Sequence, residues 1–226
     1  MIINNIVVDS TNSVTDLCML GTLYPTDKSP YNKNDNLHKH AYTSIYNLLF
    51  SSMRYKTIKL GEIGILDNNS MKMWRKYFPY AELHGYEWSD DYLKKATSDN
   101  LPNTFYTKMD VTDKFSIEKE FNNILFDVLI DDSTHKFEDQ INLINVACKY
   151  MNVGGILIIE DIFTNFDQKQ YEDSIDHLKE YFSTITFIET NHLLKYSPGW
   201  NNDKLLILFR NNIPYNDYKI SNNNSM

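Results

Sequence analysis

The chain has 226 residues, 42% of them hydrophobic and 14% aromatic, which is enough apolar material for one sizeable core. Its formal net charge of −8 argues against a nucleic-acid-binding protein, because such proteins cluster Lys and Arg to displace counterions from phosphates. Cys18 and Cys148 are too few for a disulfide framework, so we expect reduced core thiols and a cytoplasmic protein. Residues 1–10 have no basic leader and soon turn polar, which fits neither a signal peptide nor a membrane-spanning helix.

We expect a single domain over residues 1–210, with an N-terminal helical and lid segment (1–56) followed by a sheet core (57–210). The polar stretch 24–39 contains two prolines and several asparagines and is expected to form the loop or lid. Residues 211–226 are rich in Asn and Ser and have little to bury, so we expect a flexible tail.

Predicted helices and strands alternate along most of the chain. Apolar residues recur at helical spacing from Tyr42 to Met53, which predicts a first long helix. Strands are then expected at 57–63, 81–88, 104–109, 125–131 and 155–159, and helices at 70–78, 90–96, 117–122 and 137–151. This alternation predicts a parallel sheet with helices on both faces.

The last elements break this alternation. A helix is expected at 171–181, but strands 183–188 and 204–210 are joined only by a loop and would form an antiparallel hairpin at the sheet's edge. The expected fold is therefore α/β, a doubly wound, seven-stranded and mostly parallel sheet with a reversed last strand.

Two short acidic runs each follow a compact apolar stretch that is typical of a buried strand. The first runs from Asp131 through Asp132 to His135, and the second is Glu160-Asp161. Because the carboxyl ends of neighbouring parallel strands form one crevice, we expect the two runs to converge on a metal and proton-transfer site. The alternative interpretation is that these acids cap the helices that follow.

A glycine turn and two further acids indicate a nucleoside-type ligand. Gly64 lies at the first strand-to-helix turn, where a glycine lets the backbone approach a ligand closely. The turn is not a G-x-G-x-x-G fingerprint, which argues against NAD. Glu87 ends the second strand, where an acid accepts hydrogen bonds from ribose hydroxyls, and Asp110 ends the third. This order is expected for an adenosyl ligand without phosphates.

With these residues in hand, the chain resembles the class I S-adenosylmethionine-dependent methyltransferases, and more narrowly the macrocin and mycinamicin type of sugar O-methyltransferase. The resemblance spans about residues 26–210. Its motifs are Thr26-Asp27-Lys28, His40-Ala41-Tyr42-Thr43 with Tyr46, Glu62-Ile63-Gly64, Ser70-Met71-Lys72-Met73-Trp74 with Tyr77-Phe78-Pro79, Gly85-Tyr86-Glu87, Asp110, the run from Asp131 to His135, and Gly154-Gly155 leading to Glu160-Asp161.

The resemblance implies S-adenosyl-L-methionine as cofactor and a divalent cation, Mg²⁺ or Mn²⁺, held by Asp132, Glu160 and Asp161. It also implies His135 as the general base. Further residues fall on cofactor-contacting positions or near the methionine end and the lid: Glu62, Gly64, Glu87, Asp110, Asp131, Lys28 and Tyr42.

The chain departs from the family pattern in two loops. Ser133-Thr134 replaces a Gly-Ser pair, so a glycine conformation is lost there. Asn68-Asn69 stands in place of paired glycines, although Asn tolerates a left-handed backbone better than most residues. A glycine, Gly61, also stands where an aliphatic residue is usual. We expect these changes to affect substrate geometry more than cofactor binding.

The expected reaction is methylation of a sugar or glycoside hydroxyl. A cation that binds adjacent hydroxyls acidifies one of them, and His135 takes the proton as the methyl group is transferred. The loop 196–200, with an aromatic residue at each end, is a candidate platform for a sugar ring, with simple packing as the alternative. Two other functions stay open, a methyltransferase acting on a non-sugar diol and a non-catalytic glycan- or partner-binding module. No nucleic-acid or membrane partner is expected, and a homo-oligomer is one option.

Overall fold

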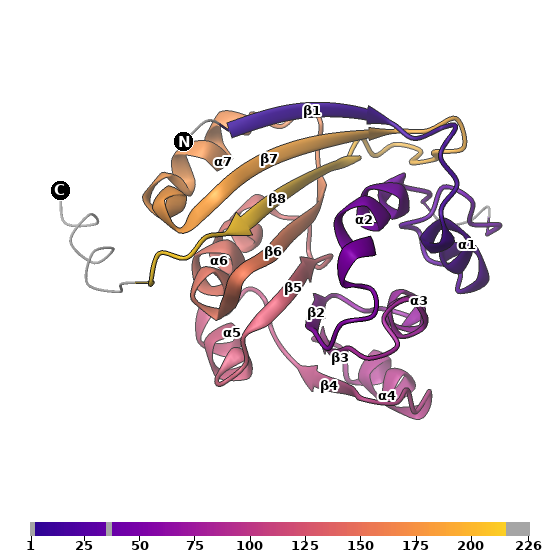
Figure 1. The fold of residues 1–226 in the computed structure, drawn as a ribbon, viewed down its shortest axis with the longest axis horizontal. Helices are drawn as coiled ribbons and strands as arrows, with labels where there is room; N and C mark the ends of the chain where they lie inside the picture. Colours follow the sequence, from indigo (N-terminus) through magenta and orange to yellow (C-terminus); the bar gives the residue numbers. More distant parts are fainter. Residues whose placement is uncertain (1–2, 35–37, 216–226) are drawn as a thin grey trace.

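The computed structural model describes residues 3–34 and 38–215, in which one mixed sheet is covered by helices on both faces (Figure 1). The strand order is β1-β7-β8-β6-β5-β2-β3-β4. The strands are β1 (Ile3–Asp9), β2 (Lys59–Ile63), β3 (Glu82–Glu87), β4 (Thr104–Lys108), β5 (Phe126–Asp131), β6 (Met151–Ile162), β7 (Phe182–Asn191) and β8 (Lys204–Arg210). Most of the expected flexible tail, from residue 216 on, lies outside the described residues.

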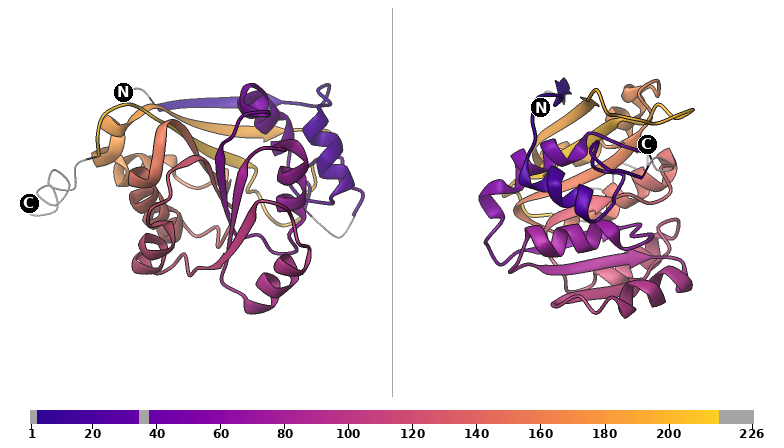
Figure 2. Two further views of the ribbon diagram at one scale, coloured as in Figure 1. Left: turned by 60° about the horizontal axis from the view of Figure 1, so that its bottom comes forward. Right: turned by 90° about the vertical axis from the view of Figure 1, so that its right-hand side faces the viewer.

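The helices divide into two layers, one on each face of the sheet (Figures 1 and 2). One layer contains α1 (Asp16–Leu23), α2 (Tyr42–Phe50), α3 (Asn69–Tyr77) and α4 (Asp90–Ser98). The other contains α5 (Lys114–Phe121), α6 (Phe137–Ala147) and α7 (Gln168–Ser174). Short 3₁₀ helices span Ser51–Met53, Cys148–Tyr150 and Asp176–Tyr181.

Side-chain alternation along the central strands builds a core on each face. On β5, Val128 and Ile130 pack with α1–α4, whereas Leu129 packs with α5–α7. Successive side chains of a strand point to opposite faces, so the part of a strand that is covered on both sides is a continuous apolar run. This explains the apolar runs of residues 128–130 in β5 and 156–159 in β6.

The topological switch point lies between β2 and β5. From β2 the chain runs outward through β3 to β4 and then returns to β5 on the other side of β2. In the parallel β2–β5 pair, Ile63 is in register with Asp131. Ligands of open α/β sheets bind in the crevice at the carboxyl ends of such strands.

The expected α/β class, the mostly parallel sheet and the reversed last strand are confirmed, since β8 is antiparallel to both β6 and β7. The strand count was wrong, because β1 adds an eighth strand parallel to β7. The edge of the sheet is therefore β1 and not the β7–β8 hairpin. Most residues of β1 are exposed or partly exposed, so its sequence lacks the clean apolar alternation of a half-buried strand.

Helix α1 was also missed in the sequence. It has eight residues, and Thr15 caps it by accepting a hydrogen bond from the backbone N–H of Cys18 at 3.2 Å. Such a short helix with an interior glycine gives a weak propensity signal. Cys18 and Cys148 are free and buried, as expected. Among the described residues no helix is both long and apolar enough to cross a bilayer.

Candidate active site

A cavity of about 580 Å³ lies at the carboxyl ends of β2 to β5. Its volume falls within the range of small-molecule binding sites, which is roughly 300–1,000 Å³. Five of the residues singled out in the sequence line it, namely Gly64, Glu87, Asp110, Asp132 and His135. The cavity therefore joins the expected adenosyl-binding positions to the first acidic run.

Gly64 lies close to the backbone of Asp132 at this cavity. Its φ is +84°, and a Cβ atom added there would lie 2.0 Å from the carbonyl oxygen of Asp132. The backbone N–H of Asp132 in turn donates to the carbonyl of Ile63 at 2.9 Å. Only glycine permits this approach, because any side chain would collide with the neighbouring backbone. The glycine turn therefore fixes the position of the Asp132 backbone.

Glu87 is held rigidly at the end of β3. Its carboxylate accepts hydrogen bonds from the backbone N–H groups of Trp88 and Ser89, both at 3.0 Å, and of Leu66 at 3.2 Å. Asp110 is exposed, and its Oδ1 accepts from the N–H and the hydroxyl of Thr112 at 3.0 and 2.7 Å. Both acids therefore face the cavity with one or more oxygens already oriented.

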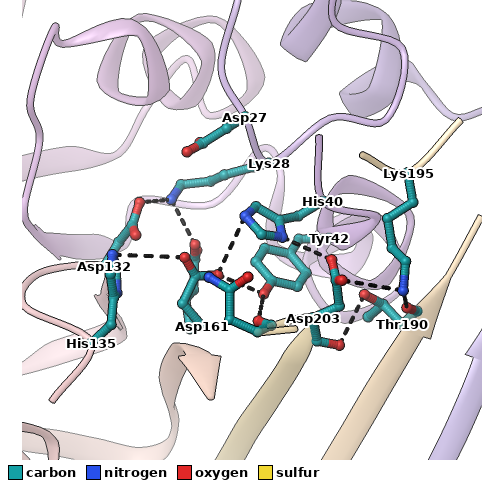
Figure 3. A network of polar contacts seen from close by, with 12 residues as sticks. Asp27, Lys28, His40, Tyr42, Asp132, His135, Asp161, Thr190, Lys195 and Asp203 are labelled. Atoms are coloured by element: carbon teal, nitrogen blue, oxygen red, sulfur yellow. Dashed lines mark hydrogen bonds and ion pairs between the residues drawn. The ribbon is translucent and has the colours of Figure 1, made fainter. Parts of the chain in front are cut away.

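Lys28 lies at the centre of the buried carboxylates (Figure 3). Its ammonium donates to Asp132 Oδ2 and, at 2.8 Å, to Glu160 Oε2, and Oε1 of Glu62 lies 3.4 Å away. Glu62 also accepts from the indole N–H of Trp74 at 2.5 Å. Burial alone would lower the pKa of Lys28, but the carboxylates outweigh it and hold the pKa well above its ordinary value.

The two acidic runs do converge, but their side chains form two groups. In the inner group, Glu160 is buried between Lys28 and the hydroxyl of Tyr46, which donates to its Oε1 at 2.5 Å. In the outer group, Asp132, His135 and Asp161 offer ligand atoms that all lie within 4.8 Å of one another. Asp132 belongs to both groups, and burial raises its pKa to about 7 although Lys28 opposes the shift.

A bulge in β6 changes the direction of the Asp161 side chain. The register between β6 and β8 shifts between Ile159 and Ile162, and Asp161 has a φ of +58°. Side chains of adjacent strand residues otherwise point to opposite faces, so the bulge allows Glu160 and Asp161 to lie at one site. Oδ2 of Asp161 lies 3.7 Å from Nε2 of His135 (Figure 3).

A second set of partners holds Asp161 from the side of α2. Its Oδ1 accepts from the hydroxyl of Tyr42 at 2.7 Å and lies 3.6 Å from Nε2 of the buried His40. Nδ1 of His40 pairs with Asp203 Oδ1 at 2.9 Å. Burial would lower the pKa of His40, but Asp161 and Asp203 outweigh it and raise the pKa to about 9.

Several expected site residues do not line the cavity. Asp131 is buried, and its Oδ1 accepts from the hydroxyl of Ser133 at 2.6 Å. Burial raises its pKa to about 6. Asp131 therefore holds the loop that contains Ser133-Thr134 and differs from the family pattern. In this loop His135 has a left-handed backbone conformation, with a φ of +56°. Other expected residues contact one another through ion pairs and hydrogen bonds and are not among the residues that line the cavity. They are Lys28, Tyr42, Glu62, Glu160 and Asp161.

Sequence reasoning assigned no role to several residues of the site, although Asp27 lies in a quoted motif. Asp27, Trp88 and Tyr92 line the cavity, and Asp203 supports His40. Trp88 directly follows Glu87 and is the last residue of the predicted strand 81–88, so its position at a strand end was an available signal. Asp203 had no such signal, because only the tertiary fold brings the start of β8 next to the segment before α2.

Comparison with known proteins gives sequence relatives and similar structures, although no protein-family model matches the chain. It is 26% identical over 170 residues to L-olivosyl-oleandolide 3-O-methyltransferase of Streptomyces antibioticus, covering 72% of this chain and 41% of the relative. It is 25% identical over 134 residues to 8-demethyl-8-(2-methoxy-alpha-L-rhamnosyl)-tetracenomycin-C 3'-O-methyltransferase of Streptomyces olivaceus, covering 56% and 33%. The chain thus spans less than half the length of these curated relatives.

A similar solved structure is the MycE methyltransferase of the mycinamycin pathway in complex with Mg and SAH. The TM-score is 0.67 at 19% identity, covering 87% of this chain and 55% of that one. The plantazolicin methyltransferase BpumL in complex with SAH gives a TM-score of 0.55 at 16% identity, covering 89% and 93%. The chain therefore has the Rossmann-like fold of class I S-adenosylmethionine-dependent methyltransferases, and its sequence is similar to those of sugar O-methyltransferases.

Proposed function

We propose that the chain is an S-adenosylmethionine- and divalent-metal-dependent O-methyltransferase that acts on a hydroxyl of a sugar or glycoside. One observation carries this proposal: the cavity lined by Gly64, Glu87 and Asp110 also has Asp132 and His135 in its wall. A methyl donor bound through its adenosyl group would thus have the acidic group beside it. Both curated relatives are named as O-methyltransferases of sugars carried on larger molecules.

The residues of the outer group fit a hard divalent cation. Two carboxylates and an imidazole lie within 4.8 Å of one another, and oxygen-rich sets suit Mg²⁺ or Mn²⁺ better than zinc. Asp132 and Asp161 belong both to this group and to the ligand set implied by the sequence, and we propose them as metal ligands. Bound there, the metal would acidify a coordinated hydroxyl and hold it in place. The structure of MycE was solved with Mg and SAH, which supports the same pairing of cofactors here.

The chain's own residues supply orientation and a proton acceptor. His135 lines the cavity and is proposed to accept the hydroxyl proton as the methyl group leaves the cofactor's sulfur. Asp161, held by Tyr42 and His40, lies 3.7 Å from Nε2 of His135 and orients its imidazole. Glu87 fixes the ribose end, so that the displacement at carbon gains mainly from positioning.

An aromatic group beside Asp161 supports a sugar acceptor. Trp200 is half-exposed and stacks on Phe163, with ring centroids 5.7 Å apart, and Phe163 follows Asp161 by two residues. His38 contacts the same indole edge to face at 6.0 Å. Aromatic faces of this kind suit the apolar face of a pyranose ring, and sugar hydroxyls would then lie toward the carboxylates.

The test is methyl transfer from labelled S-adenosylmethionine to a panel of acceptors with Mg²⁺ or with EDTA. The panel contains olivosyl and rhamnosyl glycosides, free sugars and a catechol. We expect label on a glycoside only with Mg²⁺, and His135→Asn to lower the rate by about 10²- to 10⁴-fold. The control His177→Asn alters a partly buried histidine beside α6 that bonds Asn145, outside the site.

The competing functions give different results. Transfer only to the catechol would favour the non-sugar diol enzyme. Absence of S-adenosylmethionine binding in calorimetry would favour a non-catalytic module. Salt-sensitive RNA binding would contradict the expected lack of a nucleic-acid partner. The cytoplasmic location and a homo-oligomeric state stay predictions, to be checked by cell fractionation and by light scattering.

A further inference from the structure

The cavity at the carboxyl ends of β2 to β5 has an excess of negative charge. Four acidic side chains line it, namely Asp27, Glu87, Asp110 and Asp132, and none of the described residues in its wall is Lys or Arg. Of these four acids, the buried ammonium of Lys28 is paired only with Asp132. The field inside the cavity therefore favours a cationic ligand over a neutral ligand of the same shape.

Asp27 is the acid of this wall with the fewest partners. Glu87 accepts three backbone hydrogen bonds, and Asp110 accepts two from Thr112. The carboxylate of Asp27 accepts a single long one, from the hydroxyl of Thr26 at 3.4 Å, and it forms no ion pair within the part of the chain that the structure describes. A partly buried carboxylate without a cationic partner is stabilised when a cation enters beside it.

The position of Asp27 is fixed by its neighbours in the chain. The next residue, Lys28, is held by three carboxylates, and the carbonyl of Asp27 accepts from the backbone N–H of His40 at 2.7 Å. Figure 3 shows the side chain of Lys28 pointing toward the buried carboxylates, with that of Asp27 beside it and joined to none of them. Asp27 and Asp132 both line the main cavity and also a smaller cavity next to it. Asp27 therefore lies at the end of the main cavity that contains the acidic group.

The charge of the methyl donor changes during the proposed reaction. S-adenosylmethionine has a positive sulfonium, and on transfer the bond between sulfur and the methyl carbon breaks with its electron pair staying on sulfur. The methyl carbon bonds to the acceptor oxygen, whose proton goes to His135. The product, S-adenosylhomocysteine, has lost the sulfonium charge but keeps the adenosyl and amino-acid groups. A residue that interacts with the sulfonium therefore distinguishes donor from product, whereas a contact with the shared groups does not.

We propose that Asp27 is a specificity-determining residue that favours the cationic methyl donor over its neutral thioether product. This inference rests on the proposed function, because a donor held by Glu87 and Asp110 must present its methyl group to a hydroxyl beside Asp132. The sulfur then belongs to the end of the cavity that Asp27 lines. Asp27 strengthens donor binding and favours product release once the charge is lost, since specificity is a difference between two affinities.

Calorimetric titration of the intact chain with three ligands tests this role. S-adenosylmethionine has the sulfonium, sinefungin has a protonated amine at the equivalent position, and S-adenosylhomocysteine has no charge there. EDTA is present, because a bound divalent cation would itself repel a sulfonium. We expect Asp27→Asn to weaken the binding of the two cationic ligands about tenfold and that of S-adenosylhomocysteine by less than about twofold.

Two further variants serve as controls. Asp90→Asn also removes one negative charge near the cavity, but Asp90 pairs with Lys108 and does not line the cavity, so all three affinities should stay within about twofold. Asp27→Glu keeps the charge and should keep the preference for the cationic ligands. Equal weakening of all three ligands by Asp27→Asn would assign Asp27 to the amino-acid or adenosyl group and overturn the proposal, and so would unchanged binding.

The salt dependence of binding needs no variant and covers the case in which Asp27→Asn does not fold. Raising NaCl from about 0.05 to about 0.5 M should weaken S-adenosylmethionine about two- to threefold more than S-adenosylhomocysteine, because screening acts on the additional charge. Equal salt dependence of the two ligands contradicts the proposal. If the original chain binds none of the three ligands, the proposed function fails as well, whereas binding without charge discrimination refutes only the role of Asp27.

Discussion

Replacing Gly64 by alanine tests whether the close approach of two strand ends builds the cavity. The added Cβ would lie 2.0 Å from the carbonyl oxygen of Asp132, well inside van der Waals contact, and would meet backbone rather than a movable side chain. The backbone of Asp132 must therefore shift. We expect about 1–2 kcal/mol of left-handed backbone strain plus about 1–3 kcal/mol of overpacking.

Gly154 provides a matched control for the backbone strain. Its φ of +78° is close to the +84° of Gly64, but a Cβ added there would have no atom within 4 Å. Gly154→Ala is therefore expected to lose only the strain, about 1–2 kcal/mol, with no change in cofactor affinity.

The assay combines urea unfolding, followed by circular dichroism, with calorimetric titration of S-adenosylmethionine. For Gly64→Ala we expect a lower free energy of unfolding than for Gly154→Ala and at least about a tenfold loss of cofactor affinity, corresponding to 1.4 kcal/mol. If the two variants unfold at the same urea concentration and bind the cofactor equally well, the strand ends can separate freely. The reasoning about the turn would then be refuted.

Two further predictions concern charged groups of the site. The pKa of His40 is raised to about 9 by Asp161 and Asp203, so its stabilisation is complete below pH 6.5 and is lost as the pH rises through about 9. In EDTA, unfolding free energies from pH 6 to 10 should fall by up to about 3 kcal/mol more in the original chain than in His40→Gln, and parallel curves would contradict this. Glu87→Ala should weaken S-adenosylmethionine binding by about 10- to 100-fold, because the charged group proposed to accept from the ribose hydroxyls is lost. Glu82→Ala, at the opposite end of β3, should leave binding unchanged, and an equal loss in both variants would exclude a specific role for Glu87.

The sequence by itself determined the alternation of helices and strands, because local apolar periodicity encodes which faces are buried. The continuous apolar runs of β5 and β6 and the helical stripe of α6 are signals of this kind. It also determined that acids end the strands at the switch point, because a parallel sheet brings the carboxyl ends of neighbouring strands together. The positions of Glu87, Asp110 and Asp132 at one crevice therefore follow from the sequence.

Only the tertiary structure decided the partners of each acid. Glu160 and Asp161 are neighbours in the sequence, but a bulge and the position of Lys28 direct them to different groups. Likewise, β1 is a strand because β7 offers it an unpaired edge, with each residue of β1 paired to one 182 positions later in the chain. Ion pairs and strand pairing depend on atoms that are distant along the chain and near in space, and local sequence periodicity contains no information about such distances.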